Sequence, residues 1–298
     1  MKDIQEKAYA KLNLSLDVTA RRDDGFHELA MLMQTVSVCD VLTLSLTETG
    51  GVTASCNLHF IPTDERNLAV RAAQRYLEAI GESGRGVQIR MEKSIPVGAG
   101  MGGGSADAAA VLRGMNRLFD GRMGREELES LACAIGSDVA FCVAGGSALA
   151  RGRGEILTDL PPLPDCLFVI AKPDFSISTP ELYKKLDSVA LRRHPDTAGL
   201  LEAMEQGSLR EVCRRMYNVF EDVPDRRMRT VREIKGTLLD HGALAAMMTG
   251  TGSAVFGVFE DPAGAEAARR ALEKEYRFCM TAEPVARYMD DSAHIHFG

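Results

Sequence analysis

Residues 96–112 read PVGAGMGGGSADAAAVL, and this stretch carries the strongest signal in the chain. Five of the seven residues from 98 to 104 are glycine, and an alanine-rich helical pattern, Ser105 to Phe119, follows at once. Because glycine has no Cβ, such a backbone can wrap around an anion and turn successive N–H groups toward it. The following helix would direct the positive end of its dipole at the same place. We therefore expect a phosphate-binding loop; the alternative is a flexible loop with Ser105 as the helix N-cap.

Two commoner phosphate motifs fit this stretch less well. The spacing from Gly98 to Ser105 is that of G-x-x-x-x-G-K-S, but Gly104 stands where that motif requires lysine. Three of the glycines also satisfy G-x-G-x-x-G. In a dinucleotide-binding fold, however, those glycines follow directly on a core strand, whereas residues 92–96 (EKSIP) intervene here. A nicotinamide-dependent oxidoreductase is therefore the weaker interpretation.

Hydrophobic periodicity outside the loop predicts both strands and helices. Residues 8–18 (AYAKLNLSLDV) alternate strictly, which predicts a half-buried strand with Lys11 and Asn13 on its polar side. Further strands are predicted at 35–46, 87–91 and 166–173, after a glycine turn at 249–254, and close to the C-terminus. Helices are predicted at 67–80, 105–119, 125–135, 180–186, 198–217, 225–240 and 263–276. We expect Gly136 to end the third helix in a left-handed conformation.

Strands and helices without a regular βαβ alternation favour an α+β fold of two domains. A run rich in Gly, Arg and Pro at 145–165 marks the boundary, so we divide the chain into residues 1–155 and 156–298.

The composition is that of a globular protein with a large core, and it excludes several classes of function. Of 298 residues, 45% are hydrophobic, and the net charge of −7 argues against a general nucleic-acid binder. We find neither a membrane-length apolar run nor a signal peptide, and the seven cysteines are scattered, as in reduced proteins. We expect a cytoplasmic protein without membrane, nucleic-acid or obligate protein partners. His294 and His296 are expected to be solvated rather than to bind metal.

Three segments in order resemble the signatures of the galactokinase, homoserine, mevalonate and phosphomevalonate (GHMP) kinase superfamily. They are AKLNLSLDV (10–18), the glycine loop, and MTGTGSAVFGVF (248–259). DGFHEL (24–29), GSDVAF (136–141) and FSISTPELY (175–183) are similar to the superfamily's diphosphocytidyl-methylerythritol kinases, and the resemblance covers essentially residues 8–260.

The resemblance implies an ATP-binding domain with a left-handed-crossover β/α fold and a smaller α/β substrate domain. It also implies ATP-dependent phosphorylation of the 2-hydroxyl of 4-diphosphocytidyl-2-C-methyl-D-erythritol, in the non-mevalonate route to isoprenoid precursors, with Mg²⁺ accompanying ATP.

The resemblance also implies roles for individual residues. Asp138 matches the catalytic aspartate that accepts the substrate's hydroxyl proton, and Lys11 the lysine that keeps this carboxylate charged and neutralises developing negative charge. Without the resemblance, Asp138 would be interpreted as a helix cap and Lys11 as a solvated strand residue. ATP contacts are implied for Pro96, Val97, Gly98, Ala99, Gly100, Met101, Gly102, Gly103, Gly104, Ser105 and Ala106, with Ser105 the one candidate metal ligand.

At the cytidine end, Phe26 and Tyr183 match the aromatic pair that sandwiches the pyrimidine, and His27 the residue that hydrogen-bonds the base edge. The alternative for His27 is a turn histidine without a ligand. The remaining substrate residues implied by the resemblance are Asn13, Thr179, Gly250, Gly252 and Ser253, the last three in what would otherwise be a tight turn before a strand.

The loop departs modestly from the usual form of these kinases. Ala99 and Met101 stand where Gly and Leu are frequent, and Ala106 replaces a frequent second serine. The closest competing function is another kinase of the superfamily, acting on homoserine, mevalonate or a sugar, which would need no stacking pair. A non-catalytic nucleotide-binding module is a further alternative, although binding alone requires neither Lys11 nor Asp138.

Overall fold

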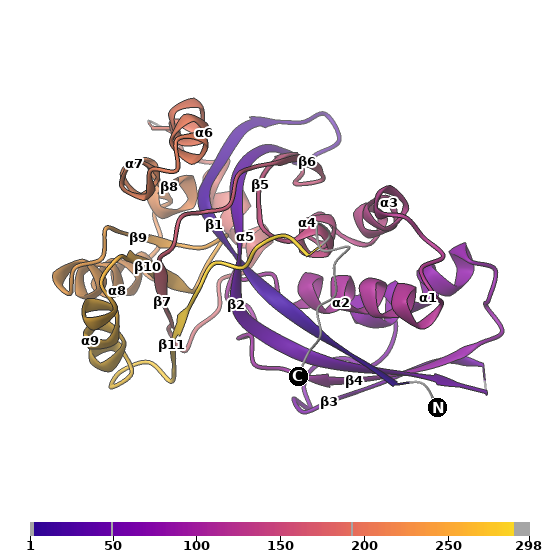
Figure 1. The fold of residues 1–298 in the computed structure, drawn as a ribbon. Coiled ribbons are helices and arrows are strands. Elements are labelled where there is room, and N and C mark those ends of the chain that lie inside the picture. The colour runs from indigo at the N-terminus through magenta and orange to yellow at the C-terminus, as the bar shows by residue number, and fades with distance from the viewer. Residues whose placement is uncertain (1–2, 49, 192, 289–298) are drawn as a thin grey trace.

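The computed structural model describes residues 3–48, 50–191 and 193–288 of the chain, which form two β-sheets with helices packed on them (Figure 1). His294 and His296 lie outside these residues. The strands are β1 (Asp3–Arg21), β2 (His27–Thr47), β3 (Gly51–Cys56), β4 (Gly86–Glu92), β5 (Ser147–Gly152), β6 (Ile156–Asp159), β7 (Leu167–Lys172), β8 (Tyr217–Asn218), β9 (Ala245–Met248), β10 (Val255–Phe259) and β11 (Phe278–Ala282). The helices are α1 (Leu68–Ala79), α2 (Gly103–Leu118), α3 (Arg125–Ile135), α4 (Val139–Ala144), α5 (Thr179–Leu186), α6 (Thr197–Glu205), α7 (Leu209–Arg215), α8 (Met228–Asp240), α9 (Pro262–Leu272) and the 3-10 helix η1 (Val219–Asp222).

The first sheet is built around the two long strands β1 and β2. Its strand order is β3-β4-β2-β1-β8, and β5 pairs with β2 and with β6. β2 is antiparallel to β1 and uses its other edge twice, pairing residues 29–34 with β5 and 41–47 with β4. Because β6 belongs to this sheet, the sheet continues past residue 155, where we divided the chain.

Helix α2 lies against β1 and β2, and α1 and α4 pack beside it (Figure 1). It begins at Gly103, two residues earlier than the predicted helix. The small residues of its buried face allow a close approach to the sheet: a Cβ at Gly114 would lie only 2.4 Å from Leu44 Cδ1.

The prediction that β1 is half-buried is wrong, because both faces of its middle section are covered. Ala10 to Val18 are all buried, including the polar residues that alternate with the apolar ones. The apolar side chains Leu12, Leu14 and Leu16 lie in the core. The polar face of the strand is covered by segments distant in sequence, described below, rather than by water.

The second sheet has the order β11-β7-β10-β9 and is antiparallel throughout. Helices α8 and α9 pack against its strands. The single predicted helix over 198–217 is in fact two helices, α6 and α7, because Gly207 takes a positive φ of 63° between them. Helix α3 ends at Ile135 as predicted, but Gly136 is extended (φ −177°) rather than left-handed, so its expected conformation was wrong.

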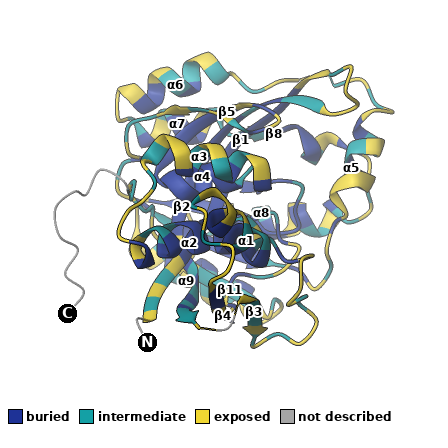
Figure 2. Cartoon of the chain, turned by 90° about the vertical axis from the view of Figure 1, so that its right-hand side faces the viewer, coloured by how far each residue is buried: buried dark blue, intermediate teal, exposed yellow. Residues whose placement is uncertain are grey.

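The two halves of the chain are joined at several points. β8, from the second half, pairs in parallel with β1 at Ser15 and Leu16. The chain after β11 returns to the first half, where Pro284 forms a bridge with Val36 and Arg287 one with Gly145. Figure 2 shows a buried interior running through β1, β2, α2 and α4, with exposed residues on the outer helices. Among the described residues, no helix has the length and apolarity needed to cross a bilayer.

Candidate active site

The glycine loop is held against the polar face of β1. The backbone N–H of Lys11 donates to the carbonyl of Met101 (3.1 Å), and a Cβ at Gly102 would lie 3.0 Å from Lys11 Cγ. Gly102 also has a φ of 71°, so both its space and its conformation require glycine. Gly102 is the N-cap of α2, and no side chain caps this helix. The alternative of Ser105 as N-cap is therefore wrong: Ser105 lies inside the first turn.

The first N–H groups of a helix have no intrahelical acceptor, and α2 leaves them without a side-chain cap. The start of α2 borders a cavity of about 260 Å³ that is lined by residues 96–104, together with Asn67, Lys93, Asp107 and their neighbours. An uncapped N-terminus beside a glycine loop with positive φ is suited to an anion.

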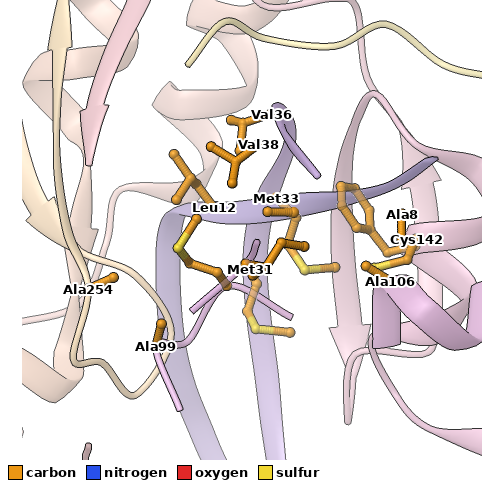
Figure 3. Close-up of a cluster of buried hydrophobic side chains, with 14 of the residues drawn as sticks. Ala8, Leu12, Met31, Met33, Val36, Val38, Ala99, Ala106, Cys142 and Ala254 are labelled. Carbon is orange, nitrogen blue, oxygen red and sulfur yellow. The ribbon is translucent and has the colours of Figure 1, made fainter. Parts of the chain in front are cut away.

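The residues that depart from the usual loop pattern point into the core. Ala99, Met101 and Ala106 are each at most 2% exposed. Figure 3 shows Ala99 and Ala106 among the buried side chains that surround Leu12 and Met31. These three side chains therefore contribute to packing beneath the loop and not to its exposed face.

Lys11 and Asp138 face each other. The ammonium lies 3.4 Å from Asp138 Oδ2 and donates to Asn13 Oδ1 at 2.7 Å. The Lys11 side chain is 6% exposed and that of Asp138 28%, so the carboxylate is the more accessible partner. Asp138 sits just before α4, but its side chain does not cap this helix. The two alternatives, Asp138 as a side-chain helix cap and Lys11 as a solvated strand residue, are therefore wrong.

A second glycine turn, residues 249–253, lies directly against the first loop. Ala254 N–H donates to the carbonyl of Ala99 (3.1 Å), and Figure 3 shows these two alanines side by side. A Cβ at Gly100 would be only 2.2 Å from the carbonyl oxygen of Thr249. The Thr249 hydroxyl accepts from Asn13 N–H (3.1 Å) and lies 3.3 Å from the Gly100 carbonyl. Lys11, Asn13, Asp138 and both glycine segments thus form one site.

At the other end of the site, the imidazole ring of His27 stacks on the ring of Tyr183. The two ring centroids are 4.7 Å apart and the ring planes are inclined by 29°, whereas Phe26 is 54% exposed under the guanidinium of Arg153. The structure thus brings His27 and Tyr183 together and leaves Phe26 outside this stack. Burial raises the pKa of Tyr183 to about 12, so its hydroxyl keeps its proton at neutral pH.

Helix α5 connects the two ends of the site. Tyr183 lies on α5, and Thr179, at its start, shares a hydrogen bond with Thr251 of the glycine turn (2.8 Å between hydroxyl oxygens). Ser253 is fully buried and donates its hydroxyl proton to the carbonyl of Phe175 (2.6 Å). Gly250 and Gly252 take positive φ values of 57° and 84°.

Several residues of the site were missed in the sequence. Asp187 accepts a hydrogen bond from His27 Nε2 (2.6 Å). Asn218 donates to the carbonyls of Met248 and Gly250, on either side of Thr249. Asp40 and Asp107 pair with Lys93 below the glycine loop. Asp40 and Asp107 could have been noticed as charged residues within apolar or alanine-rich runs, such as the aspartate in TVSVCDVLTLSL. No local sequence pattern marks Asp187 or Asn218.

The family of the GHMP kinases N terminal domain matches residues 67–146, and that of the GHMP kinases C terminal matches residues 200–277. The chain is 45% identical over 271 residues to 4-diphosphocytidyl-2-C-methyl-D-erythritol kinase of Syntrophomonas wolfei, covering 91% of this chain and 94% of the relative. It is 43% identical over 277 residues to the enzyme of that name from Alkaliphilus metalliredigens, covering 93% of this chain and 95% of the relative.

Among solved structures, a crystal structure of 4-(cytidine 5'-diphospho)-2C-methyl-D-erythritol kinase superposes with a TM-score of 0.79 at 35% identity, covering 94% of this chain and 99% of that one. A homoserine kinase from Cytophaga hutchinsonii shares the fold, with a TM-score of 0.74 at 21% identity, covering 96% of both chains. The chain therefore belongs to the GHMP kinases, in the family of the 4-diphosphocytidyl-2-C-methyl-D-erythritol kinases.

Proposed function

We propose that this protein transfers the γ-phosphoryl group of ATP to the 2-hydroxyl of 4-diphosphocytidyl-2-C-methyl-D-erythritol, releasing ADP and the 2-phosphate. The observation that carries the proposal is the contact between Lys11 and Asp138 (3.4 Å) beside an uncapped helix N-terminus and a glycine loop. Phosphoryl transfer requires alignment, charge neutralisation and a group that accepts the hydroxyl proton, and this arrangement offers all three.

Asp138 acts as the general base in this proposal. Its partly exposed carboxylate accepts the proton of the attacking hydroxyl, while the buried ammonium of Lys11 neutralises negative charge that develops on the transferring group. Asn13 fixes Lys11 by accepting its hydrogen bond, and Thr249 fixes the Asn13 backbone. The attacking oxygen is thereby held close to both charged groups.

The glycine loop and the start of α2 bind the triphosphate in this proposal, through the residues from Pro96 to Ala106. Mg²⁺ neutralises phosphate charge when it is bound. The described residues contain no cluster of three or more His, Cys, Asp or Glu side chains that could hold a metal ion. This fits an ion held chiefly by phosphates and water, with the half-buried Ser105 hydroxyl as its protein ligand.

In this proposal, cytosine is selected through aromatic stacking and through a hydrogen bond that His27 accepts at Nδ1. A base stacked on an aromatic ring gains about 1–3 kcal/mol. Since His27 already lies on Tyr183, we propose that the base stacks beside this pair, with exposed Phe26 on its other side. Gly250, Gly252 and Thr179 contact the remainder of the substrate in this proposal; Thr179 shares a hydrogen bond with Thr251 of the same glycine turn.

We also propose that the parts 1–155 and 156–298 serve as nucleotide-binding and substrate-binding domains in a cytoplasmic enzyme, with β6 of the second part completing the sheet of the first. All seven cysteines are free of disulfides, as in a reducing compartment.

The test is an ADP-release assay with Mg-ATP and the cytidyl substrate, run beside homoserine, mevalonate and galactose. Turnover confined to the cytidyl substrate is expected. Turnover confined to another acceptor would support the kinase activity but contradict the proposed substrate. ATP binding without any turnover would favour a non-catalytic nucleotide-binding module.

A further inference from the structure

Asp40 holds the segment that leads into the glycine loop. It lies on β2 and is fully buried. Its Oδ1 accepts the backbone N–H groups of Ser94 (2.5 Å) and Ile95 (2.7 Å), the two residues directly before Pro96. Charge-assisted hydrogen bonds of this kind are among the strongest in proteins, and here they fix two successive peptide planes.

Lys93 connects this segment to the residues that follow the loop. Its ammonium donates to Asp40 Oδ2 (2.5 Å) and to Asp107 Oδ2, and it lies 3.4 Å from the carbonyl oxygen of Gly103. Gly103 is the first residue of α2, and Asp107 lies one turn further along. One ammonium therefore links β2, the start of the loop and the helix at its end.

All three side chains are buried, since those of Asp40, Lys93 and Asp107 are 0%, 4% and 5% exposed. Burying three charges is costly, and well-packed apolar residues would often stabilise a fold as well. Such a cluster is therefore better explained by the geometry it specifies. Lys93 and Asp107 border the same cavity as the glycine loop.

We infer that Asp40, Lys93 and Asp107 are positioning residues for phosphoryl transfer, which fix the separation between the two ends of the glycine loop. The loop's N–H groups and the start of α2 then meet the triphosphate in a set geometry. The cluster acts through the loop rather than on the reacting atoms. The inference rests on the proposed binding of ATP at this loop.

The test compares two substitutions of Asp107. Asp107→Leu removes the link to α2 but leaves Lys93 paired with Asp40, so the remaining buried charges balance. Asp107→Asn makes the same change in charge but keeps an oxygen that accepts from Lys93. The difference between the two variants therefore reports positioning and not charge. Asp107→Ala replaces the leucine variant if the larger side chain prevents folding.

We expect Asp107→Leu to raise the KM for ATP and the dissociation constant for Mg-ADP about tenfold or more, because small displacements of binding groups are costly in phosphoryl transfer. The KM for the cytidyl substrate and the thermal midpoint should change little by comparison. Asp107→Asn should retain ADP affinity within about threefold of wild type, the size of one modest hydrogen bond.

Glu6→Gln is the matched control. Glu6 pairs with Arg113 and Arg117 toward the far end of α2, and its side chain is 10% exposed. The control loses a nearly buried carboxylate beside the same helix and should keep wild-type ADP affinity.

A folded Asp107→Leu or Asp107→Ala protein with wild-type ADP affinity would overturn the inference, as would equal losses in the leucine and asparagine variants. ADP binding is measured without an acceptor. If the cytidyl substrate is not phosphorylated while the variants still differ in ADP affinity, the proposed substrate fails and the positioning role stands.

Discussion

At the scale of single residues, the site depends on unequal exposure within one ion pair. Lys11 is enclosed by the glycine loop and by Asn13, whereas the Asp138 carboxylate remains partly open. The ammonium is therefore fixed in place, and the carboxylate that we propose meets the substrate hydroxyl is the accessible group. This division suits a base that takes up a proton in every cycle.

Asp138→Asn should lower kcat by at least about 10²-fold, because an amide cannot accept the hydroxyl proton as a base. Mg-ADP affinity should remain close to wild type, because the loop and α2, not the carboxylate, bind the phosphates. Stopped-flow or coupled turnover assays and calorimetric ADP titration measure the two effects. Asp165→Asn, an exposed position outside the site, is the control. Loss of ADP binding in Asp138→Asn would contradict the assignment.

Asp187 should determine which tautomer of His27 meets the cytosine base. A carboxylate only accepts, so at 2.6 Å it places a proton on His27 Nε2 and leaves Nδ1 for the ligand. We expect Asp187→Asn to raise the KM for the cytidyl substrate several-fold, and His27→Ala to raise it about tenfold, as for loss of a hydrogen bond.

In both variants the KM for ATP should stay unchanged, since the glycine loop lies at the other end of the site. Steady-state kinetics with each substrate varied in turn provide the measurement. An unchanged KM for the cytidyl substrate in His27→Ala would remove His27 from base recognition.

Residue-level features were predictable from the sequence only where local chemistry or resemblance marked them. The glycine loop could be identified because its composition is itself the signal. Lys11 and Asp138 could be proposed from the resemblance, but their contact joins residues 127 positions apart in the chain, which no local pattern encodes. The pairing of Lys93 with Asp40 spans 53 positions for the same reason.

At the scale of elements, α2 both borders the proposed phosphate site and packs directly against β1 and β2 of the first sheet. Apart from Asp107, its buried residues are alanine, glycine and a few larger apolar residues, so the helix axis can approach β1 and β2 closely. This approach places the helix N-terminus next to the loop. Any side chain that pushes α2 away from the sheet should therefore weaken both packing and phosphate binding.

Gly114→Ala and Gly236→Ala form a matched pair that tests this close approach. Both glycines are within helices, where alanine normally adds about 0.5–1 kcal/mol of stability. A Cβ at Gly236 on α8 would meet no atom within 4 Å, so this variant should be stabilised. At Gly114 the Cβ would lie 2.4 Å from buried Leu44, and overpacking of about 1–3 kcal/mol should exceed the gain.

Urea unfolding of the two variants gives the comparison directly. Equal stabilisation of both proteins would show that α2 can move away from the sheet without cost.

Periodicity predicted most helices and several strands but missed β3, β5 and β6, the last two within the run that we took as the domain boundary. It also did not predict the environments of the elements. Alternation identified β1 because one side is apolar, and the same alternation suggested that the other side faces water. The polar side is instead covered by the glycine loop, by Asp138 and by Thr249, which come from three distant parts of the chain. Hydrophobic patterning reports apolar burial and carries no information about polar side chains buried with partners.

At the scale of the whole molecule, the contact between the two glycine segments joins the halves of the chain. The hydrogen bond from Ala254 to Ala99 and the close approach of Gly100 to Thr249 leave little room for either segment to move alone. A ligand bound to residues 96–104 should therefore also stabilise residues 249–254.

Hydrogen exchange with and without a non-hydrolysable ATP analogue tests this coupling. We expect slower exchange in both segments. In denaturant unfolding we expect a single transition, with the free energy of unfolding raised by about 2.7 kcal/mol at a hundredfold excess of ligand over its dissociation constant. Protection confined to 96–104, or two separate transitions of which only one shifts, would show that the halves respond independently.

Strand β8 has a further consequence. It contributes only Tyr217 and Asn218 to the first sheet, yet it comes from beyond the boundary at residue 155 and covers β1 at Ser15 and Leu16. A chain cut at that boundary would lose this cover and the returning segment at Pro284, exposing backbone donors and acceptors on a long strand. Such a fragment would offer a template for pairing with other copies of itself. We therefore expect the N-terminal half to be the aggregation-prone part of this protein until β8 has been synthesised.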